Sequence, residues 1–127
     1  MKVEVSFTDL PIEESHQPLA GGAGAMVEFR GVVRGLENGV PIAALIYDLY
    51  EPMAAKVIRE IVVEISRAHP CLRVEVIHRH GTIPVGETAI YLRVDSKHRG
   101  EGFCLLEEFM NRLKKDVPIW KTGSVSC

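Results

Sequence analysis

The chain has 127 residues, of which 46% are hydrophobic and 25% are charged, and its formal net charge is −2 at pH 7. This length predicts one domain, residues 1–127, which can bury a core without disulfides or a structural metal. The near-neutral charge argues against a general binder of nucleic acid or of membrane surfaces, so any site for an anion must be a local cluster.

Cysteine usage and hydropathy indicate a cytoplasmic protein. The three cysteines, Cys71, Cys104 and Cys127, are an odd number without regular spacing, which argues against a disulfide framework. No apolar run approaches the ~20 residues that a membrane helix requires. Residues 1–10 alternate apolar and polar side chains, whereas a signal peptide would carry a continuous apolar core.

The first half of the chain predicts strands followed by a helix. Three segments have the apolar pattern of a pleated surface: residues 3–7, 25–33 and 42–50. Residues 11–24 and 34–41 contain Gly with Pro or Asn and predict loops. Pro52 can open a helix, because its missing N–H is no loss in the first turn. Apolar residues at helical spacing then continue to Ile65.

The second half predicts two more strands and a second helix. The strands are residues 72–78 and 88–94, with a turn region at 81–86, and the helix is 99–115. Pro118 cannot continue this helix, and residues 119–127 are expected to form a short tail. Strand pairs between helices predict an α+β fold, with an antiparallel or mixed sheet and two main helices on one side.

A basic turn precedes the second predicted helix. Lys97, His98 and Arg99 lie between the strand that ends near Asp95 and this helix. Free N–H groups and the positive end of the dipole at a helix start favour an anion, and Arg can hold a phosphate or carboxylate with two parallel bonds. The sequence leaves two interpretations open here, an anion site or a solvated basic turn.

A proline, a tryptophan and a lysine follow the end of the second helix. Lys114 and Lys115 need no functional explanation, because cations at a helix C-terminus offset the dipole. Pro118, Trp120 and Lys121 are different, since a rigid apolar frame around a lysine can lower its pKa and make the amine a base or nucleophile. We expect either a reactive lysine or an ordinary structural turn.

Other candidates give weaker signals. Gly31, inside a predicted strand, indicates a bulge or a close backbone approach, and Arg34 lies where this strand ends. His78 and His80 are spaced like metal ligands on one side of a strand, but no third ligand is placed to complete a site. A structural histidine pair is therefore favoured over a metal site.

Five segments between Ala25 and Lys121 form an ordered set. They are Val27–Arg34, Leu49–Ala54, Val76–Gly81, Ser96–Arg99 and Lys114–Lys121. Each is modest alone, but their order and separation together resemble the large, catalytic subunit of molybdopterin synthase. The resemblance covers most of the chain.

The resemblance implies an enzyme of molybdenum cofactor biosynthesis. Members of this family are sulfurtransferases that convert cyclic pyranopterin monophosphate into molybdopterin by inserting two dithiolene sulfurs. The sulfur arrives as a thiocarboxylate on the C-terminal glycine of a small ubiquitin-like subunit. The family implies a homodimer of large subunits with a small subunit at each end, a heterotetramer. It also implies an α/β hammerhead-type fold with an added antiparallel subdomain, and no cofactor or metal is expected.

Carried over by position, the resemblance assigns Lys114 and Lys121 to catalysis, and Arg34, His98 and Arg99 to substrate binding. Arg and His would hold the substrate phosphate through charge-assisted hydrogen bonds. A fixed cation would stabilise the oxyanion that develops during sulfur transfer, and Lys114 is expected in that role. Lys121 would orient the tail or the pterin or move a proton, and His98 could move a proton near neutral pH.

The chain departs from the family pattern in two places. The segment before Ala25 is short and rich in Gly and Pro, where the family has a clearer helix. The chain also ends six residues after Lys121, where the family continues with an acidic residue and a longer tail. We therefore expect Lys121 to be held less firmly and part of the substrate wall to be absent.

Two alternatives remain beside an active sulfurtransferase. The first is a non-catalytic relative that binds the small subunit or a pterin without completing sulfur insertion, an alternative that the short tail keeps open. The second is an unrelated acyl- or phosphate-transfer enzyme that uses the same basic pocket. That enzyme would have to match all five segments by coincidence.

Overall fold

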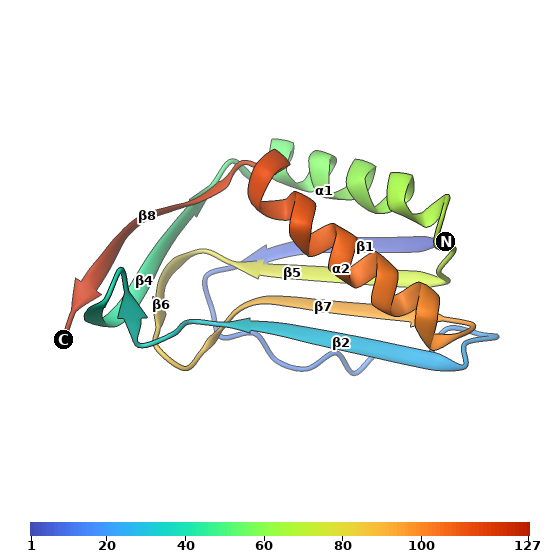
Figure 1. Ribbon diagram of the computed structural model, residues 1–127, viewed down its shortest axis with the longest axis horizontal. Coiled ribbons are helices and arrows are strands. Elements are labelled where there is room, and N and C mark those ends of the chain that lie inside the picture. The colour runs from blue at the N-terminus through green and yellow to red at the C-terminus, as the bar shows by residue number, and fades with distance from the viewer.

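The computed structural model describes residues 1–127 as two sheets and two helices (Figure 1). In chain order the elements are β1 (Lys2–Thr8), β2 (Ala25–Val32), β3 (Leu36–Glu37), β4 (Val40–Leu49), α1 (Glu51–Ser66), β5 (Arg73–Arg79), β6 (Gly81–Pro84), β7 (Thr88–Ser96), α2 (Arg99–Asp116) and β8 (Ile119–Ser126).

The larger sheet has the strand order β1-β5-β7-β2. β1 and β5 are parallel, whereas β7 is antiparallel to both β5 and β2. Both helices cover the same face of this sheet (Figure 1). The main core lies between the helices and this sheet, and it combines apolar side chains of the helices with those of β5 and β7. Its members include Ala54, Ile58, Ile61, Val62, Ile65, Val74, Val76, Ile90, Leu92, Val94, Leu105, Phe109 and Leu113. The predicted α+β fold with a mixed sheet and helices on one side is confirmed.

The two helices begin close to their predicted starts. α1 has Pro52 within its first two positions, and α2 follows His98, which is extended and makes no side-chain cap. α2 ends at Asp116, just before Pro118. Neither helix is both long enough and apolar enough to cross a lipid bilayer.

The face of the larger sheet opposite the helices carries a buried ion pair that fixes the segment between β1 and β2. Arg93 and Asp95 are 3% and 0% exposed, and Arg93 Nε donates to Asp95 Oδ1 over 3.0 Å. Arg93 also donates to the carbonyl of Gln17, and Asp95 accepts from the backbone N–H of Ala20. The Gly- and Pro-rich segment 9–24 is therefore bound to the sheet through its backbone.

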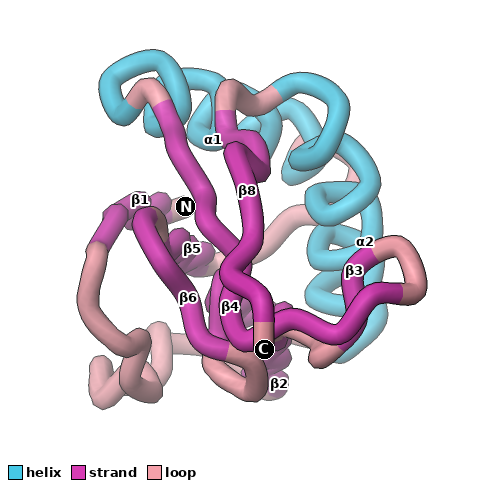
Figure 2. Tube along the Cα trace, turned by 90° about the vertical axis from the view of Figure 1, so that its left-hand side faces the viewer, coloured by secondary structure: helices cyan, strands magenta, loops and turns pink.

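The smaller sheet is built around β4 (Figure 2). β4 pairs antiparallel with β3, β6 and β8. A second, smaller core lies here, made of Val33, Ile42, Leu45, Ile83 and Ala89. This smaller sheet corresponds to the antiparallel subdomain that the family resemblance implied in addition to the α/β hammerhead-type fold.

Three predictions for this smaller sheet are wrong. Residues 81–86 were expected to be a turn but contain β6, residues 119–127 were expected to be a tail but form β8, and the predicted loop 34–41 contains β3. β8 is exposed along nearly its whole length, so it carries no apolar alternation, and pairing with β4 supplies its hydrogen bonds. The β3–β4 turn uses Asn38 and Gly39 at φ 52° and 78°, the Asn-Gly signal of a tight hairpin.

Candidate active site

A cavity of about 280 Å³ lies where the C-terminal end of α2 meets both sheets. Most of its wall is apolar, with contributions from Phe29, Val33, Leu45, Ile90, Met110, Leu113 and Ile119. Three cationic side chains also line it: Arg34, Lys114 and Lys121. The structure thus brings Arg34 to two lysines about 80 positions later in the sequence, and the three were predicted to act at one site.

Arg34 reaches the cavity because β2 changes its register just before it. The pairing of β2 with β7 shifts between Gly31 and Val32. A Cβ atom on Gly31 would lie 2.7 Å from the Cγ2 of Ile90, closer than a real Cβ allows. The predicted bulge or close approach at Gly31 is therefore confirmed. Bulges redirect the side chains that follow them, and here Arg34 lies on the cavity wall.

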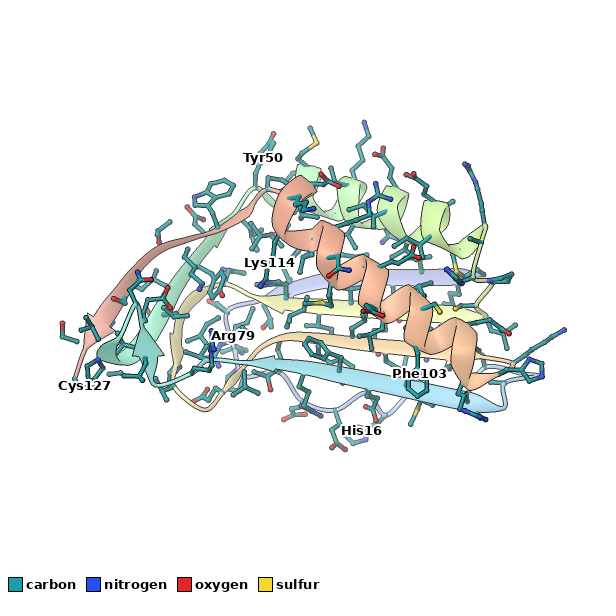
Figure 3. The ribbon with its side chains drawn as sticks, viewed as in Figure 1. His16, Tyr50, Arg79, Phe103, Lys114 and Cys127 are labelled. Carbon is teal, nitrogen blue, oxygen red and sulfur yellow. The ribbon has the colours of Figure 1, made fainter.

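Lys114 comes from the last turn of α2 and extends toward the smaller sheet (Figure 3). Its neighbour Leu113 is 7% exposed and is anchored in the main core, which fixes the end of the helix. Lys115, next in sequence, does not line the cavity. Successive side chains of a helix point in different directions, so Lys114 reaches the cavity and the adjacent Lys115 does not.

Lys121 lies in β8, where it pairs with Tyr47 of β4. Its Nζ atom is 3.4 Å from Glu37 Oε1, so a strand and an ion pair both hold it. The Lys121 side chain is nevertheless 48% exposed, so the expectation that it is held less firmly than in the family stays a prediction. The carboxylate beside it comes from the β3–β4 hairpin instead of from a longer C-terminal tail.

Three cavity residues were not predicted as site residues: Glu37, Tyr47 and His78. The rings of Tyr47 and His78 meet edge to face, with centroids 5.5 Å apart. Burial raises the pKa of Tyr47, and the nearby charge of Lys121 opposes this shift. Burial lowers the pKa of His78, while its hydrogen bond to the Arg79 carbonyl has the opposite effect. The sequence did contain a signal for His78. It continues the two-residue alternation of Val74 and Val76, which predicts that its side chain lies on the same, helix-covered face of the sheet.

His98 and Arg99 lie at the opposite end of α2 from the cavity. Lys114 is fifteen positions after Arg99 in the same helix, a separation of about 22 Å at the helical rise per residue. The His98 side chain is 81% exposed, and its nearest charged partner is Glu101 at 3.3 Å. Within one chain the structure does not bring these two residues to Arg34, Lys114 and Lys121, because a straight helix holds the two groups apart.

The two histidines considered for a metal have different surroundings. His78 is 4% exposed, whereas His80 is half-buried and follows the end of β5. The structure contains no group of three or more His, Cys, Asp or Glu side chains placed to hold a metal ion.

Comparison with known proteins settles the family of the chain. The model of the family described as "MoaE protein" matches residues 5–116. The chain belongs to the MoaE family. A Nostoc protein named molybdopterin synthase catalytic subunit is 36% identical over 119 residues, which cover 92% of this chain and 72% of that protein. A Thermoplasma volcanium protein of the same name is 32% identical, and the match covers 94% of this chain and 88% of that protein.

Solved structures of the MoaE family have the same fold. The crystal structure of molybdopterin synthase from Staphylococcus aureus superposes with a TM-score of 0.82 at 30% identity and covers 98% of this chain and 93% of that one. A MoaE protein from Burkholderia ambifaria superposes with a TM-score of 0.79 at 25% identity, over 98% of this chain and 87% of that one. The fold expected from the resemblance is confirmed.

Proposed function

We propose that this MoaE-family chain is the catalytic subunit of a molybdopterin synthase and transfers sulfur to cyclic pyranopterin monophosphate. The observation that carries the proposal is the cavity in which Arg34, Lys114 and Lys121 meet on an apolar wall. The relatives that carry the name of catalytic subunit match nearly the whole chain.

The cavity suits two anionic reactants. The substrate carries a phosphate, and the sulfur donor is the C-terminal thiocarboxylate of a small ubiquitin-like subunit. Arg34 can hold a phosphate or carboxylate through two parallel hydrogen bonds. Arg34, Lys114 and Lys121 are exposed beside the apolar wall, so a reactant that covers them would displace water and strengthen the attraction between these charges and the bound anion.

Lys114 stabilises the negative charge that develops on the acyl oxygen of the thiocarboxylate. The end of α2 holds Lys114 in place before the reaction, and a cation fixed in advance lowers the barrier without reorganising. Lys121 orients the carrier tail from the facing strand β8, where Glu37 keeps its ammonium beside the cavity.

A second copy of the chain is needed if His98 and Arg99 act on the same substrate. Arg99 and Lys114 lie about 22 Å apart along α2, too far for one small molecule to touch both. In the homodimer that the family implies, His98 and Arg99 of one copy face the cavity of the other, and a small subunit binds at each end. Three free cysteines favour the cytoplasm as the location of this assembly.

A single-turnover reaction tests the proposal. The purified chain is mixed with cyclic pyranopterin monophosphate and the thiocarboxylated small subunit, and mass spectrometry follows the carrier while the dithiolene product is detected. We expect each carrier to lose one sulfur. Lys114→Ala should slow this by about 100-fold or more, the effect of removing one preorganised charge partner.

Lys115→Ala is the matched control, because it removes the same charge one position along α2 but outside the cavity. It should react as the unmodified chain does. Full activity of Lys114→Ala would refute the assigned role of Lys114. An intact carrier in a demonstrated complex would instead identify a relative that binds without sulfur insertion.

A further inference from the structure

We infer that His78 is a ligand-binding residue of the cavity, and that its Nε2 atom accepts a hydrogen bond from an N–H group of the bound reactant. This inference rests on the proposed function for the identity of the reactants. It concerns a residue that the sequence favoured as structural, and it follows from the tautomer of the ring and its place on the wall.

The backbone of Arg79 determines the tautomer of His78. Nδ1 lies 2.7 Å from the Arg79 carbonyl oxygen. A carbonyl oxygen can only accept, so Nδ1 carries the hydrogen and donates it. In the neutral ring Nε2 then has no hydrogen and presents a lone pair. Burial among Tyr47 and the core lowers the pKa of His78, which keeps the ring in this neutral form.

The free lone pair opens to the cavity. His78 is 4% exposed, and its Nε2 atom receives no hydrogen bond from any protein donor. Nε2 is also not one of the fully enclosed, unpartnered polar atoms, which belong to Arg73, Glu75 and Arg79. The small exposed part of the ring therefore includes Nε2, and His78 lies on the cavity wall.

The other polar side chains of the wall have different hydrogen-bonding properties. Arg34, Lys114 and Lys121 have only donors, which suits the anionic end of a ligand. Glu37 is already paired with Lys121. Nε2 of His78 is an uncharged acceptor without a hydrogen of its own, whereas the hydroxyl of its neighbour Tyr47 can either donate or accept. A ligand with both an anionic group and an N–H could pair with the cations and with Nε2 of His78 in the same cavity.

Both reactants carry such an N–H. In the carrier it is a peptide N–H near the C-terminus, and in the precursor it is a ring N–H of the pterin. The shared chemistry is an amide-type donor, and binding experiments with each reactant alone identify which one His78 contacts.

Two substitutions separate the two ring nitrogens. His78→Asn can still donate to the Arg79 carbonyl but has no atom at the place of Nε2. His78→Gln reaches the place of Nε2 and offers an amide oxygen there. We expect His78→Asn to weaken binding by about 3- to 10-fold, the effect of one lost hydrogen bond, and His78→Gln to retain most of the affinity. His80→Asn is the control, because it makes the same change beside the cavity but not on its wall.

Calorimetry measures the dissociation constants of two probes, the small subunit with an ordinary C-terminal carboxylate and cyclic pyranopterin monophosphate. Weaker binding of the first by His78→Asn assigns the contact to the carrier tail, and weaker binding of the second assigns it to the pterin. Unchanged affinity for both would overturn the inference.

Imidazole ¹⁵N spectra of the unmodified chain give a test that does not depend on variants that fold. Nε2 of His78 should have the resonance of an unprotonated nitrogen, and this resonance should move when the ligand binds. A hydrogen on Nε2 in the free protein, or no movement with saturating ligand, would also overturn the inference. Because both readouts measure binding, they remain valid if the sulfur-transfer assay fails.

Discussion

Glu37 and Lys121 form an ion pair, 3.4 Å between Oε1 and Nζ, that joins the β3–β4 hairpin to β8 beside the cavity. The two residues are 84 positions apart in the sequence. The pair sets a carboxylate beside the ammonium of Lys121, and therefore next to the cavity in which an anionic ligand is proposed to bind.

Glu37→Gln should tighten binding of the carrier tail by about two- to fivefold. Both partners are partly exposed, so the pair itself contributes little, and removing a competing negative charge has the larger effect on an anion. Calorimetric titration with the small subunit measures the change. Glu60→Gln, an exposed residue of α1, removes the same charge away from the cavity and should leave affinity unaltered. Weaker binding by Glu37→Gln would mean that holding Lys121 in place matters more than competition.

Mixing two inactive variants should restore activity if one site draws on two chains. Lys114→Ala and Arg99→Ala homodimers are each expected to be defective at both sites. After subunit exchange half of the dimers are mixed, and each mixed dimer has one intact site, so about a quarter of the full activity should return. Single-turnover sulfur loss from the carrier is the measurement. Absence of recovery, with exchange shown by native mass spectrometry, would show that Arg99 does not act at the cavity of the other chain.

Asp95→Ala should lower the free energy of unfolding by about 3–5 kcal/mol, because it leaves the buried guanidinium of Arg93 without its counter-charge. The same change removes the acceptor for the Ala20 N–H, so segment 9–24 should become more open to proteolysis. Urea denaturation and limited trypsin digestion measure the two effects. Asp116→Ala, which breaks an ion pair on the surface of α2, should change both far less. A similar loss in the free energy of unfolding in the two variants would show that the buried ion pair stabilises the fold no more than a surface ion pair does.

His78 should make the protein less stable in mild acid. Its pKa in the folded chain lies below the ordinary value of 6.5. Between these two values the unfolded chain binds a proton that the folded chain does not, so the free energy of unfolding falls as the pH drops through that window. The urea midpoint of each protein, the unmodified chain and His78→Gln, is measured at about pH 7.5 and at about pH 5. The shift should be larger in the unmodified chain, and the difference isolates His78 because both proteins contain the other histidines. Equal shifts in both proteins would contradict the prediction.

Cys71 should be the least reactive thiol. Burial raises its pKa to about 11, and the charges of Glu101 and Cys104 act in the same direction. Near pH 8 only about 0.1% of this thiol is ionised, and the thiolate is the nucleophile. Iodoacetamide followed by peptide mapping should label the exposed Cys127 first, and Cys127→Ser should remove the fastest phase. Early labelling of Cys71 would show that the chain opens locally around it.

The sequence by itself determined the larger sheet and both helices, because these elements bury one face and so carry a regular apolar period. Val74 and Val76 alternate in β5, and Ile58, Ile61 and Ile65 recur at helical spacing in α1. The family resemblance also predicted Arg34, Lys114 and Lys121 as site residues, and for Lys121 the neighbouring Pro118 and Trp120 gave a second indication.

Only the tertiary structure decided which of these residues meet. β8 is exposed and has no pattern of its own, so its pairing with β4 could not be seen in the sequence, and that pairing places Lys121 beside Tyr47 and Glu37. His98 and Arg99 are close to Lys114 in sequence, yet a rigid helix holds them at its far end. Local periodicity reports which face of an element is buried, whereas contacts between distant segments depend on packing that no short stretch of sequence encodes.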